Sequence, residues 1–87
     1  FPFDEKTLFE PYRIVIEASG KLAANPHLNG AEEYITVFSG EVEITAGKES
    51  FRLSRGDSIR FPADVPHAYR NAGTERAELS MLIYYRR

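Results

Sequence analysis

Glu33 raises a chemical question, because it occupies a position where an apolar side chain would be expected. In the stretch PHLNGAEEYITVFSG, residues 26–40, Ile35 and Val37 lie two apart and so share one face of a strand. Glu33 falls on that same face, which its neighbours mark as buried. A carboxylate buried without a partner costs several kcal/mol. We therefore expect Glu33 to face a structural group, a ligand or a metal.

A second stretch, GDSIRFPADVPHAYRN at residues 56–71, contains three more polar side chains, which lie at alternate positions of one predicted strand. Its two prolines have no backbone N–H donor, so residues 62–66 are predicted to leave the strand ladder as a stiff loop. A strand then begins at His67, and Tyr69 and Asn71 share its face. If that face looks inward, the two stretches contribute to one polar region of the interior.

The turn between His27 and Glu33 adds another candidate. Asn29-Gly30 is a tight-turn pair, because both residues tolerate positive φ. A chain reversal there lets His27 and Glu33 converge on one point from neighbouring strands. Imidazole and carboxylate together suit a divalent ion such as Zn, Fe(II), Mn or Ni. The candidate metal ligands are His27, Glu33 and His67, and the candidate contacts for a small-molecule ligand are these three together with Tyr69.

Each of these residues also has a purely structural interpretation. Glu33 could be a buried carboxylate held by His67, Tyr69 or an arginine, and His27, close to the predicted turn, could be solvated. Tyr69 is as consistent with core packing as with ligand contact, although a buried phenol needs a hydrogen-bond partner. Asn71, just before a run of small residues, is more typical of a turn-closing residue. A carboxylate beside an imidazole would also make the site sensitive to pH.

Apolar and polar residues alternate along most of the chain, which is the period-two pattern of half-buried strands. Turn signals separate these runs about every 8 to 12 residues, which indicates an all-β sandwich or barrel. A helical turn is conceivable only at residues 4–10, where Asp4 would cap it. On the face opposite Ile35, we expect Tyr34 and Phe38 to contact a second sheet, another subunit or an absent domain. The main alternating runs are residues 12–17, 41–46, 51–53, 59–61 and 79–85.

Composition excludes several classes of protein. The 87 residues suffice for one small domain. The formal net charge is −2 and the Lys and Arg residues are scattered, so the sequence lacks the basic stripe of a nucleic-acid-binding surface. The chain has no cysteine, no apolar run near the roughly 20 residues that span a bilayer, and no Gly-rich phosphate loop. We expect a cytoplasmic protein without membrane contact, and assign no catalytic residue. Because the chain opens FPFDEKTLFEP without an initiator Met, we expect a fragment that lacks its N-terminal part.

The spacing within the two stretches resembles the paired motifs of the cupin superfamily, which are small jelly-roll β-barrels. In the first cupin motif a His, a Glu and a closing Gly are spaced as His27, Glu33 and Gly40 are here. The second motif contains Gly, Pro, His and Asn at fixed intervals. The residues that match it at every interval are Gly56, Pro62, His67 and Asn71.

This resemblance covers residues 12–85 and implies an all-β jelly-roll barrel, or double-stranded β-helix, with residues 1–87 forming one cupin domain. The family has four metal-ligand positions. Here His27, Glu33 and His67 match three of them, whereas Asn29 replaces the second His. An Asn carbonyl is a weak ligand for these metals, but two His and one carboxylate can still bind iron or zinc with open positions.

Within the superfamily, three segments are similar to the C-terminal cupin domains of bacterial regulators that carry an N-terminal helix-turn-helix of the XRE type. These segments are GAEEYITVFSGEVEITAG, LSRGDSIRFPADVPHAYRN and LIYY. The resemblance implies a non-catalytic domain that binds a small-molecule effector inside the barrel. It also implies an absent domain that binds DNA, and a homodimer. The alternative function is a small metal-dependent cupin enzyme, a dioxygenase or isomerase, in which the ion acts as a Lewis acid or activates oxygen.

Overall fold

In the computed structural model, which describes residues 7–24 and 30–86, every regular element is a β-strand. The described residues therefore include no helix that could cross a membrane. The strands are β1 (Thr7–Ile16), β2 (Lys21–Ala24), β3 (Glu32–Ser39), β4 (Glu41–Ala46), β5 (Glu49–Ser54), β6 (Ser58–Pro62), β7 (His67–Asn71) and β8 (Ala77–Arg86).

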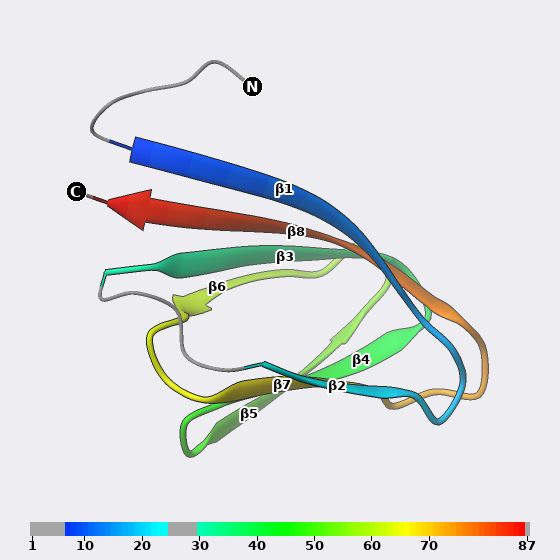
Figure 1. Cartoon of the computed structure of the whole chain (residues 1–87). Helices are drawn as coiled ribbons and strands as arrows, with labels where there is room; N and C mark the ends of the chain where they lie inside the picture. The colour runs from blue at the N-terminus through cyan, green and yellow to red at the C-terminus, as the bar shows by residue number, and fades with distance from the viewer. Residues whose placement is uncertain (1–6, 25–29, 87) are drawn as a thin grey trace.

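The strands form two antiparallel sheets that enclose a common core (Figure 1). Sheet A has the strand order β1-β8-β3-β6, and sheet B has the order β2-β7-β4-β5. Among these strands only β4 and β5 follow one another in the chain and lie in the same sheet. Every other step along the chain passes from one sheet to the other. This alternation is the jelly-roll arrangement of a double-stranded β-helix, which confirms the predicted all-β jelly-roll fold.

Alternation along each strand decides which side chains are buried. On β3, Glu33, Ile35 and Val37 point inward and are fully buried, whereas Tyr34 and Phe38 are exposed on the outer face. Of the three predicted contacts of these aromatics, a second sheet is excluded, because sheet B covers the opposite face of β3. Contact with another subunit or an absent domain stays a prediction. The buried core draws on both sheets and includes Ile16, Ile35, Val37, Val42, Ile44, Leu53, Phe61, Tyr69, Leu79, Met81 and Ile83.

The first strand begins earlier than its alternation alone suggests. Residues 7–10, where a helical turn was conceivable, belong to β1, so that prediction is wrong for these residues. Their pairing with β8 fixes them as strand, in a register that runs from Thr7 opposite Arg86 to Ile16 opposite Ala77. Asp4 lies outside the described residues.

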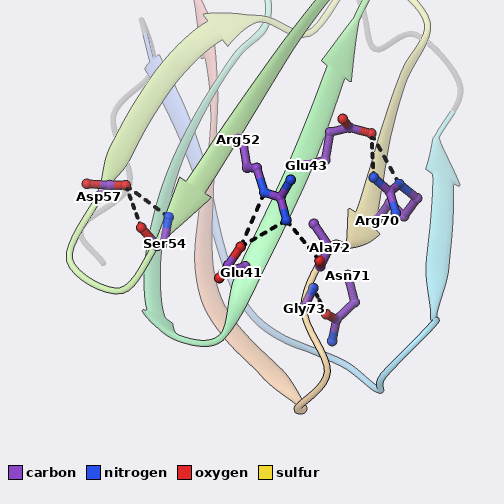
Figure 2. A network of polar contacts seen from close by, with 9 residues as sticks. All are labelled: Glu41, Glu43, Arg52, Ser54, Asp57, Arg70, Asn71, Ala72 and Gly73. Atoms are coloured by element: carbon purple, nitrogen blue, oxygen red, sulfur yellow. Dashed lines mark hydrogen bonds and ion pairs between the residues drawn. The ribbon is translucent and has the colours of Figure 1, made fainter.

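Charged pairs between strands cover the outer face of sheet B (Figure 2). Arg70 of β7 lies 3.1 Å from Glu43 of β4, and Arg52 of β5 lies 3.1 Å from Glu41 of β4. The Arg52 guanidinium also donates to the carbonyl of Ala72 at 3.1 Å. Exposed ion pairs contribute only about 0–1 kcal/mol each. This face is therefore a solvated surface, and the shared core holds the sheets together.

Candidate functional site

Three polar side chains meet inside the barrel, one from sheet A and two from sheet B. The Oε2 atom of Glu33 on β3 lies 2.9 Å from Nε2 of His67 on β7. The hydroxyl of Tyr69, two residues further along β7, donates a hydrogen bond to Oε1 of Glu33. All three residues are buried, with at most 4% of their surface exposed. We call them the Glu33–His67–Tyr69 cluster. Among the described residues, the Glu33 carboxylate thus contacts two side chains of the same chain.

The imidazole of His67 is oriented by the loop that precedes it. Its Nδ1 atom lies 2.8 Å from the carbonyl oxygen of Val65, which can only accept, so Nδ1 carries a hydrogen. Nε2 therefore faces Glu33. The two side chains thus contact each other directly inside the core, with the imidazole oriented by its Nδ1–H bond to the Val65 carbonyl.

The loop that supplies the Val65 carbonyl is tied to both sheets. Pro62 is the last residue of β6, so the first residue of the predicted 62–66 loop still belongs to the strand. The N–H of Ala63 donates to the carbonyl of Ala31 at 2.9 Å, and the N–H of Gly47 donates to the carbonyl of Pro66 at 2.9 Å. These bonds place the loop against β4 and the start of β3. The loop can therefore hold the imidazole in one orientation.

Apolar groups surround the cluster and separate it from water. The ring of Phe61 meets the His67 ring edge-on at 5.8 Å, and the Sδ atom of Met81 lies 4.0 Å from the Tyr69 hydroxyl. Burial raises the pKa of the Tyr69 phenol well above its usual value, and the hydrogen bond to Glu33 raises it further. The phenol therefore stays protonated and acts as a donor.

Asn71 points to the same side of β7 but has a structural role. Its amide donates to the carbonyl oxygens of Ile16 at 2.9 Å and Glu75 at 2.7 Å. Its side-chain oxygen accepts from the N–H of Gly73 at 2.9 Å (Figure 2). Asn71 thus joins the end of β1 to the β7–β8 connection, as expected for a turn-closing residue.

The structure brings together three of the four predicted site residues. His27, the fourth, lies outside the described residues, as does Asn29. Within the part of the chain that the structure describes, no group of three His, Cys, Asp or Glu side chains could hold a metal ion. Its two candidate metal donors, Glu33 and His67, contact each other directly. The described residues alone therefore do not fit a metal centre, and a metal ligated by His27, Glu33 and His67 stays a prediction.

Sequence inspection missed the contribution of Val65. It acts through its backbone carbonyl, and every residue type has one. The only related signal is the pair of prolines, which predicts a stiff loop without indicating which carbonyl faces the imidazole. The partner that fixes the imidazole tautomer can therefore be identified only from the structure.

Comparison with known proteins shows that the chain is similar to a part of several transcriptional regulators. The profile described as "Cupin domain" matches residues 13–84. The chain is 33% identical over 87 residues to the HTH-type transcriptional regulator SutR of Escherichia coli K12, covering 100% of this chain and 49% of that protein. It also resembles the crystal structure of the Cupin_2 domain of an XRE family regulator from Enterobacter cloacae, with 35% identity, a TM-score of 0.88, and coverage of 100% of this chain and 92% of that one.

A third relative is an HTH_3 family transcriptional regulator from Vibrio cholerae, with 31% identity and a TM-score of 0.89. This match covers 100% of the chain and 48% of the Vibrio protein. The chain thus spans about half the length of the curated regulator and of this Vibrio regulator.

Proposed function

Because the chain belongs to the cupin family, we propose that it is the non-catalytic effector-binding domain of a helix-turn-helix transcriptional regulator. The effector is a small molecule bound inside the barrel. Two observations support this function. Relatives of about twice the length are transcriptional regulators, and a polar cluster is buried in a core that is otherwise mostly apolar. DNA binding would belong to a domain outside this chain, and a homodimer in the cytoplasm stays a prediction.

The observation that carries the proposal is the direct contact between Glu33 and His67 at 2.9 Å. Buried polar groups are costly unless each has a partner. An effector that separates this pair must therefore offer a donor to the carboxylate and a complementary group to the imidazole. Molecules without such groups would leave buried atoms unsatisfied, which gives the cluster its selectivity. The effector changes DNA binding only if it favours one arrangement of the full protein over another.

The test is a thermal-shift screen of the 87-residue chain against small polar metabolites. A compound that binds the folded state raises Tm. We expect His67→Ala to weaken the binding of such a compound about tenfold or more, because a hydrogen bond to a charged group contributes about 1.5–3 kcal/mol. Circular dichroism of this variant should still show the strand signal. A matched pair, Glu33→Gln inside the barrel and Glu43→Gln on the outer face, separates loss of the site from loss of charge. Full binding by His67→Ala would contradict the proposal.

One observation favours the metal-dependent enzyme as a second candidate. A metal-ligating His commonly donates its other N–H to a carbonyl or carboxylate, and His67 donates Nδ1–H to Val65 while Nε2 faces the interior. Elemental analysis of the purified chain distinguishes the candidates. Stoichiometric Zn, Fe, Mn or Ni that is lost in Glu33→Gln but kept in Glu43→Gln would support the enzyme, and the absence of stoichiometric metal would support the effector domain.

A further inference from the structure

The outer face of sheet A, unlike that of sheet B, exposes large apolar side chains. Among the described residues, five large hydrophobic side chains are exposed, and three of them, Val15, Tyr34 and Phe38, lie on this face. The other two, Tyr12 and Leu22, lie on the inward sides of their strands. The outer face of sheet B has none of the five and is covered by the Arg–Glu pairs of Figure 2. Because exposed apolar patches mark interaction sites, the outer face of sheet A is a candidate interface.

Apolar and aromatic side chains form a row across the strands of this face. The strand registers place Pro11 of β1, Leu82 of β8 and Tyr34 of β3 side by side. The Tyr84 ring meets the Tyr34 ring edge-on at 6.4 Å, and Cζ of Arg60 lies 5.8 Å from the centre of the Tyr34 ring. No described strand covers this row (Figure 1). Since aromatic and arginine side chains are enriched where proteins bind each other, the row has the composition of an interface.

The charges on the outer face of sheet A balance one another. Near one edge, a guanidinium nitrogen of Arg13 lies 3.1 Å from Oε2 of Glu78. Near the other edge, Nε of Arg60 lies 3.8 Å from Oε1 of Glu32. Each side of the face thus carries one cation and one anion, whereas the whole chain has a net charge of −2. A second copy of the chain presents the same balanced set and is not repelled, while a strongly acidic or basic partner finds no excess charge to bind.

The face is also large enough for two copies to associate. Its strands are 5 to 10 residues long. With strands about 4.8 Å apart and about 3.3 Å per residue, the four strands cover a flat area of about 500 Å². The accessible area is larger because side chains project from the sheet. A stable interface buries about 800 Å² per partner, so this face suits a reversible dimer.

We propose that the outer face of sheet A is a dimer interface, on which two copies of the chain pack face to face about a two-fold axis. The apolar row lies at the centre of the interface, and the two Arg–Glu pairs lie at its rim. The exposed aromatics of β3 then contact another subunit, which is one of the predicted contacts. The dimer does not depend on what the barrel interior binds, because Glu33 lies on the opposite face of β3.

The test is sedimentation equilibrium of the 87-residue chain at concentrations up to about 1 mM. We expect an equilibrium between monomer and dimer. Phe38→Glu and Val15→Glu should each raise the dissociation constant about tenfold or more, because each places an unpaired carboxylate from both copies in the apolar part of the interface. Ser50→Glu adds the same charge to the outer face of sheet B and should leave the dissociation constant unchanged. All three positions are exposed, so circular dichroism should show the same strand signal in every variant.

Dilution of the ¹⁵N-labelled wild-type chain, followed by two-dimensional NMR, identifies the surface without any substitution. The amides of Val15, Tyr34 and Phe38 should shift with concentration, whereas those of Glu43 and Arg70 on sheet B should not. The proposal is overturned if the chain is monomeric at every concentration, or if the dimer persists in both Phe38→Glu and Val15→Glu, as expected for pairing through strand edges. Phe38→Glu should still bind any compound found in the thermal-shift screen, so the dimer and the effector site can fail separately.

Discussion

Tyr69 combines almost complete burial with a carboxylate as the acceptor of its hydroxyl. Both favour the protonated form, so the pKa of Tyr69 lies well above the ordinary value of about 10 in the folded chain. The unfolded chain releases this proton near pH 10, whereas the folded chain keeps it. The stabilisation from Tyr69 is therefore fully present below pH 10 and declines as the pH rises further.

We predict that Tyr69→Phe changes how stability depends on alkaline pH. The variant should lose about 1–3 kcal/mol at neutral pH, because the buried Glu33 carboxylate loses a donor. Above pH 10 the wild-type chain should lose stability faster than the variant, so the two curves of unfolding free energy converge. Urea unfolding between pH 7 and 11 measures both curves. Tyr34→Phe, at an exposed position, is the control and should stay parallel to the wild type; parallel curves for Tyr69→Phe would contradict the prediction.

The meeting of Glu33 and His67 follows from the sequence, whereas the orientation of the imidazole does not. Strand parity places both residues on inward faces, and the cupin resemblance places β3 and β7 opposite one another. The orientation depends on the Nδ1 contact with Val65, which has no sequence signature. Whether His27 joins the cluster stays a prediction.

At the scale of elements, two turn glycines look alike in sequence but differ in their surroundings. Gly40, between β3 and β4, and Gly56, between β5 and β6, adopt φ values of +81° and +89°. A Cβ atom on Gly40 would lie 2.8 Å from Cα of Ala77 and 2.9 Å from the carbonyl oxygen of Arg76. A Cβ on Gly56 would meet nothing within 4 Å. Sequence identifies both turns, but only the packing of β8 against the first turn makes Gly40 sterically necessary.

We predict that Gly40→Ala is much more destabilising than Gly56→Ala. At Gly56 the cost is conformational alone, about 1–2 kcal/mol for an alanine in the left-handed region. At Gly40 the same cost adds to a clash with backbone atoms that cannot easily move. Thermal unfolding of the two variants measures the difference directly, and equal losses of Tm would show that the contact with Ala77 is unimportant.

For the whole molecule, the two sheets depend on a single core, so neither should unfold alone. Leu79 of sheet A and Leu53 of sheet B belong to the same buried cluster. Each change, Leu79→Ala and Leu53→Ala, should lower the unfolding free energy, by about 2–5 kcal/mol for the fully buried Leu79. Urea unfolding should remain a single transition in both variants. A second transition in either variant would mean that the sheets are separable.

Alternation along the chain predicts strands and their buried faces, but it cannot give the order of strands within the sheets. Ile35, Val42 and Leu79 all read as inward positions, yet nothing local indicates that β8 lies between β1 and β3. The cupin resemblance, which the family match confirms, implies a jelly-roll barrel, and the structure supplies the strand order.

The passage of the chain from sheet to sheet also constrains the order in which structure can form during folding. The β4–β5 hairpin, which pairs Glu41 with Ser54 and Ala46 with Glu49, is the one strand pair here that joins strands adjacent in the chain. Every other strand must wait for a partner made distant by the intervening chain, and β1 waits for β8, which is synthesised after all the other described strands. Chains dominated by such remote pairings fold in about milliseconds to seconds. A newly made copy therefore exposes unpaired strand edges until β8 has left the ribosome.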